Sequence, residues 1–352
     1  MTIRVHARAQ VRAAAALLAM AALAAPVAAQ ERVVRVGTVR SLATLSNYVA
    51  IEKGWWKELG IRVEIEDLDT SANVISLLAT NRLQVVEGGV SAGLFNGLEQ
   101  NMPIVVAGDR ISTPLHHKLL VREDLRGKVA RLADLKGLNV GTNGLAAVTT
   151  YELGRMMESD GGALKDIELK TVAFPLMGAA FKNRAIDATL VIQPWATQMV
   201  DQKLAFVLAD PDDHVKPRPL TIAVTMFNTD WAKADPKLAR DFFVGYMRGV
   251  REYCLGYHGG PQRAELVEIG LKAMKGSPRA FFEDYPWPAR NMDGTPNMPS
   301  ILDMQTYFKG ENMVKAEQPA EKIFTREYIE HAAKALGPKP AVNAQSDKPG
   351  CR

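Results

Sequence analysis

Apolar and polar positions in the first part of the chain follow the periods of strands and helices in turn. A β-branched apolar run at 33–39 predicts a buried strand, and apolar residues at a helical period predict a helix over 48–59 that Gly60 ends. The pattern then predicts strands at 61–68, 83–86 and 103–107 and helices at 74–80 and 92–100. Because strands and helices alternate, we predict a largely parallel sheet with right-handed crossovers.

The same order of elements returns further along the chain. An apolar strand at 138–140 leads through a polar turn into a helix expected at 148–159, as 33–39 leads into 48–59. Residues 63–68 of the strand at 61–68 have a counterpart at 167–172, and helices are also expected at 176–184 and 195–202. Two similar βαβαβ units indicate two lobes with a cleft. We therefore predict an α/β protein of two lobes, each a mostly parallel sheet flanked by helices.

The chain is expected to cross between the lobes twice, near 111–119 and near 218–225, as a two-stranded hinge. The segment 118–122 indicates an edge or crossover strand. The first lobe then comprises 30–112 and 222–336, the second comprises 113–221, and 337–352 forms a tail. Helices are expected in the last part of the first lobe at 235–257, 261–275, 301–314 and 325–336. The tail is rich in Pro, Lys, Ser and Asn, which predicts disorder.

Residues 1–29 predict a cleaved signal peptide. Three arginines precede an apolar run of small residues at 13–25, and Val-Ala-Ala at 27–29 fits a cleavage site, so the mature chain is expected to start at Gln30. The run is too short for a comfortable transmembrane helix. No Cys follows the cleavage site, so a lipid anchor is not expected. We expect an exported, soluble protein of the periplasm.

Loss of the signal changes the charge of the protein. The formal net charge is +4, and the signal carries three Arg and no acidic residue, which leaves +1. No cluster of Lys and Arg with interleaved aromatic residues occurs, so nucleic acid is not an expected partner. Cys254 lies in a predicted helix and Cys351 in the tail. A disulfide between them would tether only a loose end, so their pairing is not favoured.

The sequence Gly89-Val-Ser91-Ala-Gly93 matches the nucleophile elbow of serine hydrolases. That chemistry needs a downstream His as base and a carboxylate to orient it, and no His lies in a recognisable setting. Gly and Ser at a strand-to-helix turn also serve as turn and N-cap residues. The hydrolase therefore remains the alternative.

His116-His117 raises the question of a metal site. Adjacent side chains on a strand point to opposite faces, so both rings cannot easily bind one ion. A surface pair on a hinge strand is the favoured interpretation. No P-loop, dinucleotide fingerprint or metalloprotease motif occurs, so neither a metal nor a cofactor is expected.

Small polar residues follow the predicted strands in both lobes. The carboxyl ends of parallel strands meet at one edge of a sheet, where ligands bind, and helix N-termini at that edge suit an anion. Each Ser or Thr has the alternative role of capping its own helix. Phe174, Met177 and Trp195 would supply an apolar wall. The predicted ligand-binding residues are Ser41, Thr44, Asn47, Ser71, Asn73, Ser91, Thr142, Asn143, Thr149, Met177 and Trp195.

The chain resembles the periplasmic solute-binding proteins of ABC importers for nitrate, sulfonates, taurine and thiamine precursors, the SsuA/THI5-like family. The matching segments span about 33–230, and they are 49–64, 78–83, 119–124, 134–137 and 185–195. Two segments depart from the family pattern: Val85-Val-Glu87-Gly stands where the family often has Asp-Val/Ile-Ala, and the order around Trp195 is Gln-Pro-Trp where the family has Trp-Glu-Pro. Both departures concern the expected pocket.

The resemblance implies capture without chemistry by a type II periplasmic binding protein. A small organic anion would bridge the lobes, close the hinge, and be delivered by this monomer to a membrane permease. A neutral heteroaromatic such as a thiamine pyrimidine precursor is an alternative ligand. A sensor or an enzyme of thiamine-pyrimidine synthesis is an alternative role. An export signal argues against the synthetic enzyme.

Overall fold

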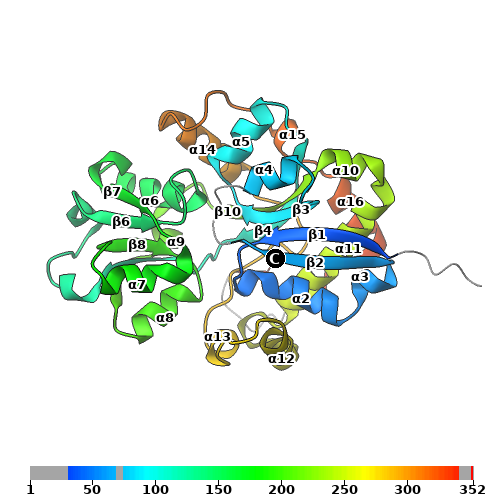
Figure 1. Ribbon diagram of the computed structural model, residues 1–352, viewed down its shortest axis with the longest axis horizontal. Coiled ribbons are helices and arrows are strands. Elements are labelled where there is room, and N and C mark those ends of the chain that lie inside the picture. The colour runs from blue at the N-terminus through cyan, green and yellow to red at the C-terminus, as the bar shows by residue number, and fades with distance from the viewer. Residues whose placement is uncertain (1–30, 69–73, 341–349, 352) are drawn as a thin grey trace, which may run out of the picture. The chain divides into compact units, whose positions relative to one another are not determined.

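The computed structural model describes residues 31–68, 74–340 and 350–351, and its strands form two mixed sheets (Figure 1). The first sheet has the order β2-β1-β3-β10-β4. Its strands are β1 (Arg32–Thr38), β2 (Ile61–Asp67), β3 (Val85–Gly89), β4 (Ile104–Ser112) and β10 (Thr221–Asn228). β1 and β3 are parallel, and β10 lies antiparallel between β3 and β4.

The second sheet repeats this arrangement in the order β7-β6-β8-β5-β9. Its strands are β5 (Lys118–Arg122), β6 (Asn139–Thr142), β7 (Glu168–Thr171), β8 (Ala188–Val191) and β9 (Ala205–Ala209). β5 pairs antiparallel with both β8 and β9, so the prediction of an edge strand at 118–122 is wrong, and its prediction as a crossover strand is right. Each sheet is therefore mostly parallel and contains one antiparallel strand, β10 in the first sheet and β5 in the second. Each of these two strands follows a segment in which the chain passes from one sheet to the other.

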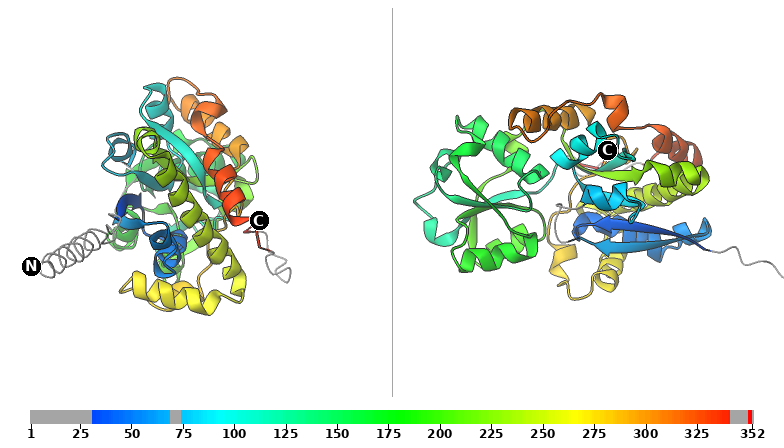
Figure 2. Two further views of the ribbon diagram at one scale, coloured as in Figure 1. Left: turned by 90° about the vertical axis from the view of Figure 1, so that its right-hand side faces the viewer. Right: turned by 45° about the horizontal axis from the view of Figure 1, so that its top comes forward.

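Helices cover both sheets in the positions that the sequence indicates. Those of the first part of the chain are α2 (Leu45–Glu52), α3 (Trp55–Glu58), α4 (Val74–Ala79) and α5 (Ala92–Glu99). The helix predicted over 48–59 is broken in two because Gly54 adopts φ 73°. Helices α6 (Val148–Ser159), α7 (Met177–Lys182), α8 (Trp195–Asp201) and α9 (Pro211–His214) accompany the second sheet, with helices on both of its faces (Figure 2).

The last third of the described chain is helical. It comprises α10 (Thr229–Ala234), α11 (Pro236–Leu255), α12 (Arg263–Ala273), α13 (Ala280–Glu283), α14 (Met298–Gly310), α15 (Ala320–Ile323) and α16 (Glu327–Leu336). In α11, Asp235 caps the first turn by accepting a hydrogen bond from the Leu238 N–H at 2.9 Å. The segment 284–297, between α13 and α14, has no helix or strand.

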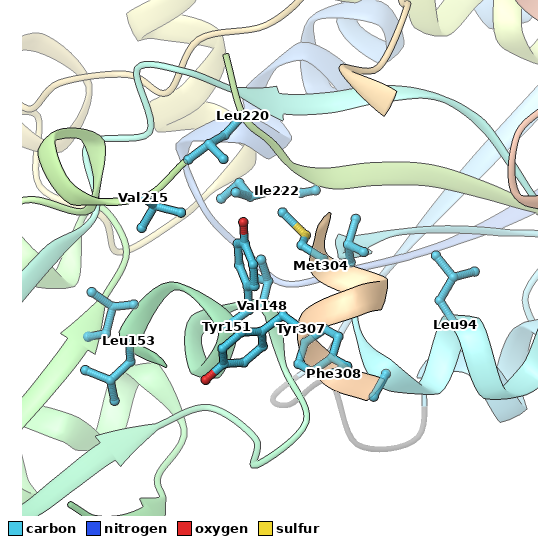
Figure 3. Packing of buried hydrophobic residues seen from close by; sticks show 14 of the residues in the cluster. Leu94, Val148, Tyr151, Leu153, Val215, Leu220, Ile222, Met304, Tyr307 and Phe308 are labelled. Atoms are coloured by element: carbon cyan, nitrogen blue, oxygen red, sulfur yellow. The ribbon is translucent and has the colours of Figure 1, made fainter. Parts of the chain in front are cut away.

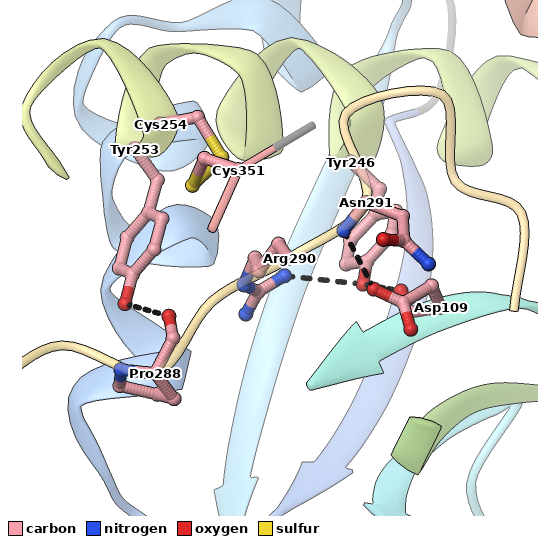
Figure 4. The surroundings of a disulfide bond; sticks show 8 residues. All are labelled: Asp109, Tyr246, Tyr253, Cys254, Pro288, Arg290, Asn291 and Cys351. Carbon is pink, nitrogen blue, oxygen red and sulfur yellow. Dashed lines mark hydrogen bonds between the residues drawn. A yellow bond between two sulfur atoms is a disulfide. The ribbon is translucent and has the colours of Figure 1, made fainter. Parts of the chain in front are cut away.

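Cys254 and Cys351 form a disulfide, contrary to the sequence-based expectation (Figure 4). The end of the chain returns to α11, where Cys351 is buried. Arg251 also donates to the backbone carbonyls of Leu336, Gly337 and Pro338. The prediction of a disordered tail is therefore wrong for 337–338 and for Cys351, because α11 holds both. Residues 341–349 of that predicted tail lie outside the described part of the chain.

A buried apolar cluster extends from the first sheet through α5 and α14 to α6 and the second sheet (Figure 3). Tyr307 of α14 packs edge-on against Tyr151 of α6, with ring centroids 5.4 Å apart. A Cβ atom at Gly154 would lie 1.5 Å from Tyr307 Oη, so only glycine allows α14 to approach α6 this closely. Asp303 of α14 also accepts hydrogen bonds from Arg155 at 2.7 Å and from Tyr151 at 2.8 Å.

Candidate functional site

A cavity of about 70 Å³ lies where the carboxyl ends of the parallel strands of both sheets meet. Space of this size holds several waters or a small ligand. Most of its lining is apolar and comes from residues of both sheets and their helices, including Val39, Ile111, Val148, Phe174, Ile222 and Met226. Six polar residues join them: Glu87, Ser91, Arg110, His117, Asn143 and Thr149. An apolar pocket with a few placed polar groups is typical of small-molecule sites.

Arg110 and Glu87 form a buried ion pair on the first-sheet side of the cavity. Arg110 Nε donates to Glu87 Oε2 at 3.1 Å, and the two side chains are 3% and 0% exposed. Asn47 Nδ2 donates to the other carboxylate oxygen at 2.9 Å. Arg110 Nη2 donates to the hydroxyls of Thr38 and Thr44 at 2.6 and 3.2 Å. Nη1 of Arg110 has no partner among the described residues, so it is the part of the guanidinium that is left for a ligand.

A chain of hydroxyl groups orients Asn143 on the opposite side. Thr142 Oγ1 lies 2.7 Å from Thr149 Oγ1, and Thr149 Oγ1 donates to Asn143 Oδ1 at 2.8 Å. The carbonyl end of the amide is therefore occupied. Its Nδ2 group has no partner in 31–68, 74–340 or 350–351, and Asn143 lines the cavity, so the amide can act as a hydrogen-bond donor to a ligand.

The N-terminus of α6 also opens at the cavity, where Val148 and Thr149 belong to the lining. The first N–H groups of an α-helix have no partner within the helix, and they carry the positive end of its dipole. Just before the helix, the carbonyl of Ala146 accepts a hydrogen bond from the N–H of Ala92 in α5 at 3.1 Å. The backbone at the start of α5 therefore contacts the backbone just before α6 beside the cavity.

His117 is a second buried ionisable group of the cavity. Its Nδ1 lies 3.1 Å from both carboxylate oxygens of Glu152 in α6, and the side chains are 4% and 0% exposed. The favoured interpretation of His116-His117 as a surface pair is therefore wrong for His117, because the crossing segment packs it against α6. His116 takes φ 58° and lies near His258 instead, with ring centroids 6.5 Å apart.

The predicted ligand-binding residues fall into four groups in the structure. Three line the cavity: Ser91, Asn143 and Thr149. Four are buried but do not line it, and they are Ser41, Thr44, Asn47 and Thr142. Met177 packs in one apolar cluster with Phe174, and Trp195 stacks on Phe174 with ring centroids 5.6 Å apart, so both lie next to the wall without being part of it. Ser71 and Asn73 lie outside the described residues.

Sequence reasoning missed three charged groups as site residues: Glu87, Arg110 and His117. Glu87 was visible only within a segment that departs from the family pattern, and Arg110 only as a possible arginine for an anionic ligand that was not counted among the site residues. The one sequence signal for these residues was their position at or after the end of an apolar strand. A charged side chain in such a position is rarely buried without a partner.

Ser91 occupies the N-cap position of α5, but its side chain makes no capping hydrogen bond, and it lines the same cavity as His117. A nucleophilic serine needs a hydrogen bond to its base. In the part of the chain that the structure describes, no hydrogen bond joins Ser91 Oγ to a histidine. Among those residues there is also no group of three or more His, Cys, Asp or Glu side chains placed to hold a metal ion.

Comparison with known proteins identifies the family. Residues 43–255 match the NMT1/THI5-like family, so the chain belongs to it. No curated protein shows a significant match. None of the described helices combines the length and the hydrophobicity that a membrane span requires.

Solved structures confirm the two-lobed α/β fold of periplasmic binding proteins. The alkanesulfonate-binding protein SsuA from Xanthomonas axonopodis pv. citri, bound to MOPS, is 17% identical with a TM-score of 0.66, and the match covers 86% of this chain and 99% of that one. The periplasmic nitrate-binding protein NrtA from Synechocystis PCC 6803 is 15% identical with a TM-score of 0.72, over 88% and 91%. A cysteine-to-serine mutant of DszB in complex with biphenyl-2-sulfinic acid is 13% identical with a TM-score of 0.58, over 87% and 99%.

Proposed function

We propose that this protein is the periplasmic substrate-binding component of an ABC importer and that it captures a small organic anion, a carboxylate or a sulfonate, in the cavity between its two sheets. It acts as a monomer without chemistry of its own and delivers the ligand to a membrane permease. Family membership supports the role, and the structural neighbours that bind an alkanesulfonate, nitrate or a sulfinic acid support the ligand class.

The observation that carries the proposal is the excess of hydrogen-bond donors around the cavity. Arg110 Nη1, Asn143 Nδ2 and the N–H groups of Val148 and Thr149 are donors, while the oxygens of Glu87 and Asn143 already accept protein hydrogen bonds. Donors that lack a protein partner in a largely apolar pocket favour a ligand that accepts hydrogen bonds and carries negative charge. The apolar remainder of the lining fits an organic body.

A thermal-shift screen of the chain from Gln30 tests the proposal. The protein is unfolded and refolded in phosphate buffer first, because sulfonate buffers and carried-over ligand would occupy the site. The panel holds alkyl and aryl carboxylates and sulfonates, taurine, nitrate, and neutral pyrimidine precursors of thiamine. A ligand at a hundredfold excess over its Kd stabilises the folded protein by about 2.7 kcal/mol.

A rise in melting temperature with organic anions supports the proposal. A rise with pyrimidines alone would mean that the protein binds a neutral heteroaromatic and not an organic anion, and it would still be a binding protein. If nothing shifts the transition, the binding role is contradicted. A fluorophosphonate probe then tests the hydrolase: labelling that disappears in Ser91→Ala establishes a reactive serine, and no labelling excludes that alternative.

A further inference from the structure

We propose that His117, held by Glu152, supplies the positive charge that an anionic ligand requires, so that ligand binding takes up a proton at this pair. The inference rests on the proposed function and specifies how the same cavity selects charge. It concerns a residue that the sequence assigned to the surface.

The charges already present in the cavity show why Arg110 cannot supply this charge alone. Arg110 is paired with Glu87, and both are buried, so together they contribute no net charge. Glu152 is 0% exposed and faces His117. With His117 neutral and Glu152 ionised, the four groups would carry a net charge of −1, and an anion would make it −2. A proton on the His117–Glu152 pair brings these values to 0 and −1, which lowers the cost of burying the ligand's charge.

The geometry leaves one polar atom of His117 for the ligand. Nδ1 is engaged by the Glu152 carboxylate at 3.1 Å, which fixes the ring. Nε2 has no hydrogen-bond partner among the residues described, and the ring is part of the cavity lining. In the protonated ring Nε2 carries a hydrogen, so it donates to an anionic head group.

The surroundings of His117 favour its protonated form. Burial alone lowers the pKa of His117, but the charge and hydrogen bond of Glu152 raise it, as do the carboxylates of Asp212 and Asp210, and the resulting pKa lies above the ordinary 6.5. Asp210 is itself paired with Lys118, which follows His117 in the chain.

Across the cavity stand Glu87 and Arg110, which balance one another. The neighbouring His116 behaves in the opposite way, because burial lowers its pKa to about 4, and it is therefore neutral above pH 6. Of this adjacent pair, only His117 has a pKa raised above its ordinary value.

The first arm of the test needs no ligand. Proton–carbon NMR of the histidine rings is followed against pH in the protein from Gln30, with His117→Gln to assign the resonance. We expect the His117 ring to titrate above 6.5 in the wild type and lower in Glu152→Gln. A His117 ring that titrates below 6.5, or does not respond to Glu152→Gln, overturns the proposal.

The second arm uses hexanoate with its neutral isostere hexanamide, and butanesulfonate with butanesulfonamide, in calorimetric titrations between pH 6 and 9. We expect only the anions to bind, with affinity falling by up to about tenfold per pH unit above the pKa of His117. His117→Gln should weaken anion binding at least tenfold and remove this pH dependence. His116→Asn is the matched control, because Asn tolerates a positive φ, and it should keep both the affinity and the pH profile.

The outcomes separate this inference from the proposed function. Equal binding of amide and acid, or anion affinity that is flat with pH, overturns the role of His117 and leaves a binding protein in place. If none of the four probes binds and the wider screen also finds nothing, the proposed function fails, and the NMR arm still decides whether His117 carries the proton.

Discussion

Replacing Arg110 by Met tests the charge balance of the cavity. Arg110→Met removes the guanidinium and leaves the Glu87 carboxylate with Asn47 as its remaining donor. Both side chains are almost fully buried, at 3% and 0% exposure. Breaking a buried ion pair by removing one partner costs about 3–5 kcal/mol, because the other charge stays in an apolar setting.

The matched control is the double variant Glu87→Gln with Arg110→Met. The introduced glutamine would still accept the hydrogen bond of Asn47 without a buried charge, so we expect the double variant to recover most of the loss and to lie within about 1–2 kcal/mol of the wild type. Urea unfolding of the chain from Gln30, followed by tryptophan fluorescence at pH 7, gives both values. Both variants should also lose affinity for organic anions, because both lack Nη1 of Arg110.

A loss below about 1 kcal/mol in Arg110→Met, the range of an exposed pair, would refute the reasoning. So would a double variant that is no more stable than the single one, because the cost would then come from lost packing and not from the unpaired carboxylate.

Three further predictions concern the surroundings of the site. Gly154→Ala places a Cβ 1.5 Å from Tyr307 Oη, so it should destabilise the protein by about 1–3 kcal/mol in calorimetry, and an unchanged melting temperature would contradict the close approach of α14 to α6. The pKa of His116 is lowered to about 4 by burial, so the folded state excludes a proton that the unfolded state binds below 6.5. Stability should therefore fall as pH drops from 6.5 to 4, by up to about 1.4 kcal/mol per unit, and His116→Asn should show a smaller fall in urea unfolding. Replacing Cys254 and Cys351 together by Ser removes a cross-link between residues separated by 97 positions in the sequence. Because the unfolded chain gains entropy, the free energy of unfolding should fall by up to about 5 kcal/mol. Equal melting temperatures of the double variant and the oxidised wild type would show that the bond does not constrain the unfolded chain.

The fold was predictable because the local periods of the chain agree with it. The repeated strand–turn–helix order and the helical periods of α6 and α11 appear in the sequence at nearly the observed bounds. The position of β5 inside its sheet was not predictable, because pairing with β8 and β9 is set by residues far apart in sequence. The disulfide was missed for the same reason: no local pattern shows that the chain end returns to α11.

The candidate site could be predicted only at its edges. Turn residues such as Asn143 and Thr149 follow the carboxyl ends of strands. Ligands bind at this edge of open parallel sheets, so these residues could be identified from the sequence. The sequence cannot distinguish a threonine that lines a cavity from one that orients a neighbour, as Thr142 orients Thr149. Arg110 and His117 lie in or beside apolar strands, and only the fold shows that Glu87 and Glu152 lie beside them.

The central claim, that these residues hold the ligand, is tested most directly by one calorimetric titration. The organic anion with the largest shift in the thermal screen is titrated into the wild type and into the double variant Thr142→Ala with Thr149→Ala. Without the two hydroxyls, Asn143 loses the hydrogen bond that fixes its amide, and the cavity loses part of its polar wall. We expect one site per chain and at least a tenfold weaker affinity in the variant, with an unchanged circular dichroism spectrum. Equal affinity in the two proteins would contradict the site.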